Sequence, residues 1–184
     1  MMPDQEITHD KVDKLAEDAE YLVDEAEALK YVIDSVPFEE KPPGGLSILN
    51  LLKLIDHAQH QYYRPVIEKV LTENRVQKLS HYEHFDDTFD EVPKGEGNVQ
   101  KTLNKIIKHR AALLNLLKGI PLIDWERELK DDKGKEILLI EFVGEMILKE
   151  RGMLKNIAEL IMIYQNEKQH QREINRKASQ RNQS

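Results

Sequence analysis

Two histidine pairs come nearest to metal chemistry in this chain. His57 and His60 are separated by two residues, as are His81 and His84, and this spacing lets two imidazoles share one metal ion. Helical periodicity places the first pair on a polar face, which predicts surface histidines. The second pair is followed by three aspartates, Asp86, Asp87 and Asp90. We expect an ordinary polar connection there, with a metal site as the alternative if the segment is ordered.

Glu150 is a carboxylate among apolar neighbours, with Ile147 and Leu154 within about one helical turn. A carboxylate in such a position needs a partner or a raised pKa. It is either part of an ion pair or hydrogen bond with a residue of another helix, or an acid that lines a pocket. Lys149 and Met153 lie beside it, four residues apart, and therefore share one face of the helix.

Other chemistry has no support in the sequence. Phosphate-binding loops, nucleophile elbows and zinc-protease motifs are absent. The chain has no cysteine, which excludes a thiolate nucleophile, a disulfide and a cysteine-bound zinc. The repeated Glu-x-x-His pairs of di-iron bundles are also missing. The residues themselves therefore assign no catalytic group, metal or cofactor.

Four segments carry the apolar spacing of amphipathic helices and must position these residues. The predicted caps are Thr8 or Asp10 for the first helix, Ser47 for the second and Asn98 for the third. The helices are expected at about 10–34, 47–71, 98–118 and from about 135 to beyond 164. No alternation typical of a β-strand is found.

The breaks between these helices indicate how they are arranged. A Pro- and Gly-rich segment, 37–45, ends the first helix, and the polar stretch 72–97 separates the second from the third. A connection of that length can carry the chain back along the bundle, so that the second and third helices are parallel. We expect an all-α four-helix bundle as a single domain of residues 1–184. Its core covers about 10–165, and a basic polar helical extension or tail covers 166–184.

Charge and hydropathy exclude several classes of protein. The net charge of −7 argues against a nucleic-acid binder, because phosphate contact needs a basic face. The mean hydropathy is −0.62, and no stretch approaches the ~20 apolar residues of a membrane span. The acidic N-terminal segment lacks the apolar core of a signal peptide. We therefore expect a cytoplasmic protein that contacts neither nucleic acid nor membrane.

Two segments resemble the DinB/YfiT-like superfamily. Residues 46–58 (LSILNLLKLIDHA) look like the opening of its second helix, and residues 146–157 (MILKERGMLKNI) are similar to its last-helix motif. The resemblance implies an up-down-down-up four-helix bundle that is often dimeric. It also implies a divalent metal held by three histidines, one on the second helix and an H-x-x-x-H pair on the last. Relatives use that metal to catalyse the transfer of low-molecular-weight thiols, isomerisation or hydrolysis.

This sequence departs from the superfamily at all three ligand positions, where it has Leu54, Lys149 and Met153. Leucine has no donor atom, lysine is protonated at neutral pH, and a thioether favours soft Cu(I) over zinc, nickel or manganese. Glu150 matches the acid often found between the two histidines. Leu54 and Met153 either fill the old site while Lys149 reaches solvent, or Lys149 replaces the metal charge and pairs with Glu150 or an anionic ligand.

We therefore expect a bundle that has lost the metal site and binds a small molecule or a protein partner without metal catalysis or a cofactor. The alternative is a thiol-dependent transferase or hydrolase that works through an altered pocket. The resemblance also implies a homodimer. A separate hypothesis, based on charge alone, is that the acidic first helix packs against the basic tail of a second copy.

Overall fold

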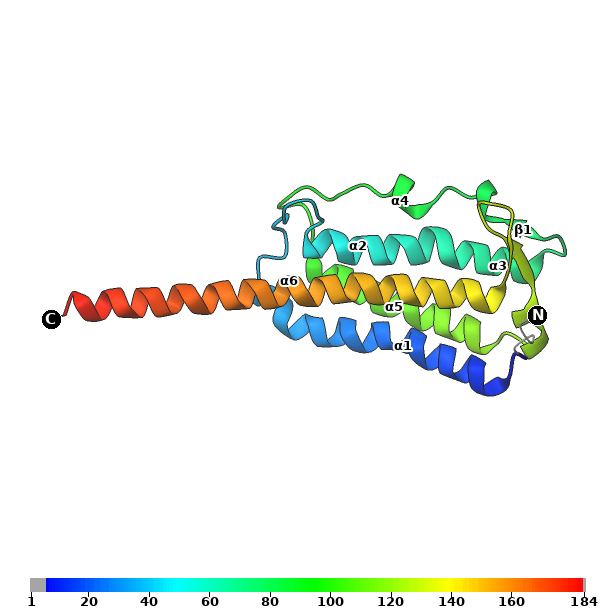
Figure 1. The fold of residues 1–184 in the computed structure, drawn as a ribbon, viewed down its shortest axis with the longest axis horizontal. Helices are drawn as coiled ribbons and strands as arrows, with labels where there is room; N and C mark the ends of the chain where they lie inside the picture. The colour runs from blue at the N-terminus through cyan, green and yellow to red at the C-terminus, as the bar shows by residue number, and fades with distance from the viewer. Residues whose placement is uncertain (1–5, 184) are drawn as a thin grey trace.

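The structure is a computed structural model that describes residues 6–183. Its framework is a bundle of four long helical segments lying side by side (Figure 1). In chain order these are α1 (His9–Val32), α2 (Ile48–Ala58) continued by α3 (Arg64–Thr72), α5 (Val99–Lys118) and α6 (Leu139–Arg181). The shorter helical pieces are α4 (Phe85–Thr88) and the 3-10 turns Ile33–Ser35, Leu79–His81 and Leu122–Glu126.

The chain course confirms the up-down-down-up arrangement. Figure 1 shows α1 and α6 running in one direction and α2, α3 and α5 in the other. The long connection 73–98 returns along the whole bundle, which makes the second and third helical segments parallel. Parallel neighbours need such a return, because a short loop would force them to be antiparallel.

The predicted helix starts are confirmed at their caps. The side-chain oxygens of Thr8, Ser47 and Asn98 accept hydrogen bonds from the backbone N–H groups three residues later, at Lys11, Asn50 and Lys101. Each bond satisfies a donor that the first turn of a helix leaves free. The sequence therefore determined these three boundaries locally.

A π-helical segment, Gln59–Tyr63, joins α2 to α3. It ends two residues before Pro65, which has no N–H to donate and whose ring crowds the carbonyl one turn earlier. A wider turn accommodates this defect and changes which residues face inward afterwards. As a result Gln59, Tyr62 and Tyr63 are all buried. The sequence predicted one continuous helix over about 47–71. The structure divides it into α2, the π-helical segment and α3, which follow one another without a break.

The absence of strands was a wrong prediction, although the sheet is small. Its strands are β1 (Gln77–Lys78), β2 (Glu128–Lys130) and β3 (Glu136–Leu138). β1 pairs in parallel with β2, which pairs antiparallel with β3. The last helix consequently begins at Leu139 instead of near Lys135. Two- and three-residue strands are too short to show alternation, and pairing across distant segments stabilises them.

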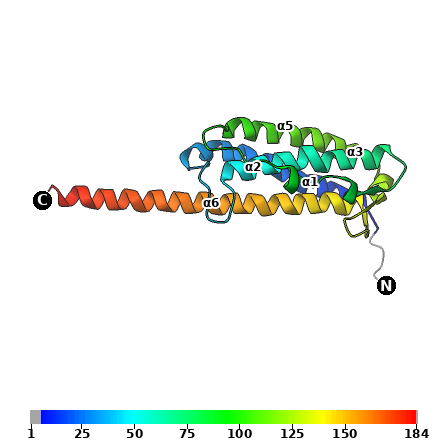
Figure 2. The ribbon, with the colours of Figure 1, turned by 90° about the horizontal axis from the view of Figure 1, so that it is seen from above.

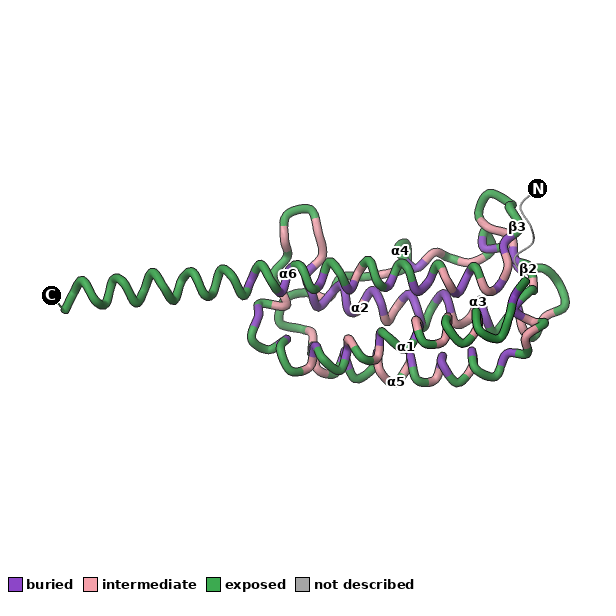
Figure 3. Tube along the Cα trace, turned by 60° about the horizontal axis from the view of Figure 1, so that its bottom comes forward, coloured by how far each residue is buried: buried purple, intermediate pink, exposed green. Residues whose placement is uncertain are grey.

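The buried residues, purple in Figure 3, are distributed along the helices of the bundle. Their apolar side chains form two clusters. One cluster includes Trp125, Phe142 and Met146, near the end that carries the sheet. The other includes Ile33, Ile55 and Leu103, near the opposite end. Polar side chains are buried as well, and the largest of them is Arg110, with no exposed surface.

The last helix continues well beyond the bundle (Figure 2). Every residue from 165 to 183 is exposed, whereas Tyr164 is still buried. At about 1.5 Å per residue, the helical part after Tyr164 projects roughly 25 Å. Within the described residues, no helix combines the length and the apolar character needed to cross a membrane.

Candidate functional site

Leu54 and Met153 are apolar side chains where the superfamily resemblance places metal ligands. Leu54 lies on α2 with 9% of its surface exposed, and Met153 is half-buried on α6. Both pack in the cluster that contains Met146 and Ile147. Neither side chain offers a donor atom suited to zinc, nickel or manganese. The residues present therefore do not fit a hard or borderline divalent metal.

Lys149, at the third of these positions, is exposed. Its Nζ lies 5.2 Å from the centroid of the Phe85 ring, which belongs to α4 in the long connection. This is within the range of a cation–π contact. Over the described part of the chain, no carboxylate forms an ion pair with Lys149. The ammonium thus lies near the Phe85 ring and does not pair with Glu150.

Glu150 is buried, and its partner is Arg110 of α5. The Arg110 Nη2 donates to Glu150 Oε1, its Nε donates to Gln59 Oε1 at 2.8 Å, and its Nη1 donates to the Ala19 carbonyl oxygen at 3.1 Å. Four helical segments therefore meet through one guanidinium. We call Gln59, Arg110 and Glu150, together with the Ala19 carbonyl, the buried polar layer.

Two electrostatic effects act in opposite directions on the pKa of Glu150. Burial raises the pKa of Glu150, while the charge and hydrogen bond of Arg110 lower it. An ionised pair compensates part of the desolvation cost, and only when the remaining donors also find acceptors. Here Gln59 and Ala19 supply those acceptors. Each nitrogen of the Arg110 guanidinium thus has an acceptor within the layer. Burial is the larger effect on Glu150 and leaves its pKa raised, and its carboxyl group serves as a structural partner of Arg110.

His57 and His60 lie on the outer side of the bundle, as predicted, but a third histidine that the sequence did not indicate joins them. The His60 and His109 rings are stacked with centroids 4.4 Å apart, and His109 Nδ1 lies 2.6 Å from Asp56 Oδ1. These residues line a shallow surface cavity of about 560 Å³. His109 is on α5, and only the packing of α5 against α2 brings it there.

The His81 and His84 pair does not form a metal centre. His84 Nδ1 accepts the backbone N–H of Asp86 at 3.3 Å, which caps α4, and its ring lies against Phe85 and Tyr62. Among residues 6–183, no group of three histidine, aspartate or glutamate side chains is arranged to hold a metal ion. In the long connection, His84 therefore serves local structure.

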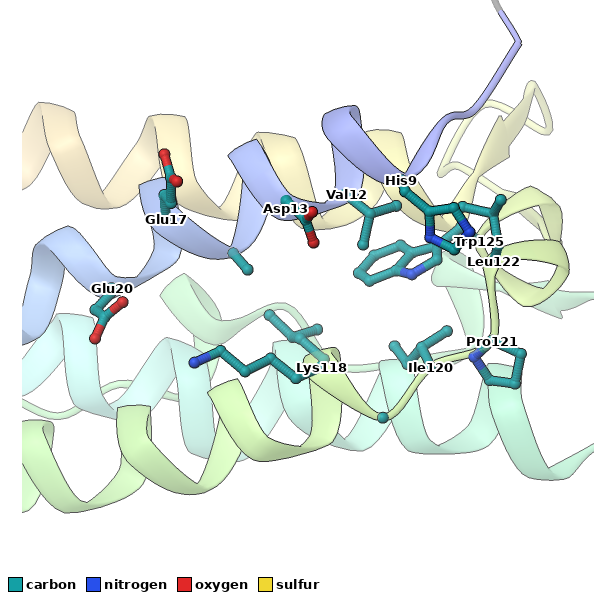
Figure 4. Close-up of a pocket in the computed structure, with 13 residues that line it drawn as sticks. His9, Val12, Asp13, Glu17, Glu20, Lys118, Ile120, Pro121, Leu122 and Trp125 are labelled. Atoms are coloured by element: carbon teal, nitrogen blue, oxygen red, sulfur yellow. The ribbon is translucent and has the colours of Figure 1, made fainter.

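A larger cavity, of about 660 Å³, lies between the first half of α1 and the turn that follows α5 (Figure 4). We call it the end pocket. Its apolar wall comes from both sides and includes Val12, Ala16, Leu117, Ile120, Leu122 and Trp125. Its polar lining consists of His9, Asp13, Glu17, Glu20 and Lys118. This volume is within the range of small-molecule sites.

Trp125 gives the end pocket its most informative polar atom. The side chain is 1% exposed, and in Figure 4 the indole lies between Val12 and Ile120. Its Nε1–H is buried and has no hydrogen-bond acceptor among the described residues. Buried indole N–H groups are ordinarily paired, and an unpaired one costs about 1–3 kcal/mol. The sequence analysis did not predict the pocket beside Trp125.

Comparisons with known proteins bear on the fold. No protein-family model and no curated protein matches the chain. A search of solved structures finds YfiT from Bacillus subtilis, described as a probable metal-dependent hydrolase with an unusual four-helix bundle topology. The TM-score is 0.70 at 16% identity, over 87% of this chain and 91% of that chain. The chain therefore has the four-helix-bundle fold of YfiT, the fold implied by its resemblance to the DinB/YfiT-like superfamily.

Proposed function

We propose that this chain is a small-molecule-binding protein of the YfiT fold that works without a metal ion between α2 and α6. The observation that carries the proposal is the fate of Glu150, which Arg110 neutralises inside the core. Leu54 and Met153 support it because they fill the neighbouring space with apolar volume. The small molecule then binds in a pocket elsewhere in the bundle.

The end pocket is the proposed binding site. It is larger than the cavity beside His60 and His109, and neither cavity is lined by Leu54, Lys149, Glu150 or Met153. A site at the end of the bundle leaves the buried polar layer undisturbed. A metal-dependent hydrolase, as YfiT is described, would instead need ligands that these three substituted positions do not supply.

Elemental analysis tests the metal-free part of the proposal. Protein purified without a histidine tag is expected to contain far less than one equivalent of zinc, nickel or manganese. Added metal is expected to leave the thermal unfolding midpoint unchanged, because a ligand that binds only the folded state would raise it. One equivalent of tightly bound metal would contradict the proposal and favour the transferase or hydrolase alternative.

A matched gain-of-site variant makes this test sharper. The triple substitution Leu54→His, Lys149→His and Met153→His supplies three imidazoles at the superfamily positions. If these positions still converge, the variant binds about one zinc or nickel ion, as a three-histidine site does. Circular dichroism checks that the variant is folded. A folded variant that binds no metal would show that positions 54, 149 and 153 do not correspond to the superfamily's ligand positions. The residues at these positions would then no longer support the proposal of a metal-free protein.

A further inference from the structure

The polar lining of the end pocket carries an excess of negative charge. Asp13, Glu17 and Glu20 follow one another at spacings of four and three residues, which places them along one side of α1. Over residues 6–183, none of the three forms an ion pair with a basic side chain, whereas the neighbouring Asp18 pairs with Lys14 and Arg151. Among the described residues that line the pocket, Lys118 is the only lysine or arginine. An entering cation is therefore favoured over an anion.

The apolar wall indicates that the cationic group belongs to a molecule with an apolar body. Val12, Leu117 and Ile120 offer an apolar surface, and a ligand that covers it is stabilised because water is excluded from both surfaces. An inorganic cation would bury none of this surface, and no described group of ligands is arranged to coordinate one. An organic molecule with an apolar body uses both the wall and the acidic side of α1.

The unpaired indole N–H adds a requirement at the inner end of the ligand. A buried donor without a partner gains an interaction when an acceptor reaches it, and the enclosed surroundings make that hydrogen bond stronger than it would be in water. Trp125, which carries this buried donor, and the acidic side of α1 thus line a single cavity.

We propose that the end pocket binds an organic cation, an amine or ammonium with an apolar body, that carries a hydrogen-bond acceptor for the Trp125 indole N–H. The ammonium group faces Asp13, Glu17 and Glu20, and the apolar body packs between α1 and the turn after α5. This inference rests on the proposed function, because it assigns a ligand class to the same pocket.

The test uses the intrinsic fluorescence of Trp125, the single tryptophan of the chain. The full chain is titrated with three probes that share a phenyl body: phenethylammonium, the neutral phenethyl alcohol and the anion hydrocinnamate. Phenethylammonium is expected to change the emission at a concentration at least about fivefold lower than the alcohol, and hydrocinnamate to bind weakest. Added salt is expected to narrow the difference, because the acids are exposed.

Matched variants locate the charge effect. The triple variant Asp13→Asn, Glu17→Gln and Glu20→Gln is expected to lose most of the preference for the cation while still binding the neutral alcohol. The control removes the same charge from the other end of α1, with Asp24→Asn, Glu25→Gln and Glu27→Gln, and is expected to keep the preference. Equal loss in both variants would point to the general field of the protein and overturn the pocket assignment.

The indole N–H is tested with a probe that carries an acceptor. Tyramine methyl ether, an amine with an ether oxygen, is compared with phenethylammonium by calorimetry on the wild type and on Trp125→Phe. The wild type is expected to prefer the ether by about fivefold, the effect of one hydrogen bond, and the variant to lose this preference. An unchanged preference in the folded variant would remove the indole from the proposal.

The remaining outcomes separate this inference from the proposed function. If all three phenyl probes bind equally well, the pocket binds small molecules but the cationic class is wrong. If none of them changes the emission of Trp125, the inference is overturned, and metal analysis still decides whether the chain works without a metal ion. Tight binding of hydrocinnamate alone would reverse the assigned charge.

Discussion

At the scale of single residues, the buried polar layer has the largest energetic consequence. Arg110 has no exposed surface, so its charge depends on the carboxylate of Glu150. Glu150→Gln leaves that charge without its counterion and is expected to lower the free energy of unfolding by about 3–5 kcal/mol. Urea denaturation measures the loss. Glu145→Gln on the exposed side of the same helix is the control and is expected to change stability by less than about 0.5 kcal/mol.

Removing both charges distinguishes a buried ion pair from ordinary packing. The double variant Arg110→Met and Glu150→Met replaces the pair with apolar side chains of similar length. It is expected to be more stable than either single substitution, because neither charge is left uncompensated. Losses that simply add in the double variant would show that the two side chains do not act as a pair.

Glu73 provides a pH-dependent contribution at the surface. Hydrogen bonds from Lys69, Arg75 and Gln77 lower its pKa to about 2. A carboxyl whose pKa is lower in the folded state stabilises the fold above its unfolded pKa, and this contribution is lost as pH falls toward the folded value. Glu73→Gln is therefore expected to lose less stability than the wild type between about pH 4.5 and about pH 2. Thermal unfolding over this range gives the difference, and parallel curves would contradict the shift.

At the scale of elements, the end of the long connection is held close to α2. A Cβ built on Gly97 would meet the Leu49 side chain, which is 1% exposed, and would lie 3.4 Å from Val92 Cγ1. Gly97→Ala is expected to destabilise the protein by about 1–3 kcal/mol through overpacking. Gly144→Ala is the opposite case, because nothing lies within 4 Å of its Cβ in α6. There the higher helix propensity of alanine is expected to add about 0.5–1 kcal/mol. Thermal unfolding of both variants checks the difference in sign.

At the scale of the whole molecule, charge is divided between the bundle and the extension of α6. Helix α1 carries eight acidic and three basic side chains, whereas residues 165–183 carry two acidic and five basic ones. This complementarity supports the expected homodimer, with the extension of one copy along α1 of the other. Such contacts between exposed charges weaken with salt. We expect sedimentation to show self-association at about 50 mM NaCl that is lost at about 500 mM.

Charge reversal on the extension tests the same association. Arg172→Glu, Arg176→Glu and Lys177→Glu are expected to abolish self-association, since they place like charges against α1. Lys101→Glu, Lys105→Glu and Lys108→Glu make the same charge change on exposed positions of α5 and serve as the control. A monomer under all conditions would contradict the dimer, and equal effects in both variants would show only a general charge effect.

The sequence by itself determined the four long helical segments, the N-caps of three of them and their order. Thr8, Ser47 and Asn98 act on donors three residues away, and apolar periodicity and the Pro- and Gly-rich break are equally local signals. It also identified Glu150 as a carboxylate that needed a partner. The length of the connection 73–98 was enough to predict parallel neighbours, because chain reach limits the topology.

Only the tertiary structure decided which residues meet. Arg110 lies in a polar run of α5, and nothing in that run says that it turns toward Glu150, Gln59 and Ala19. His109 joins His60, and Trp125 borders a pocket with Asp13, for the same reason. The three short strands form because distant segments are brought together. Periodicity fixes the face of one helix, but contacts between helices depend on their rotation and packing, which a single sequence does not encode locally.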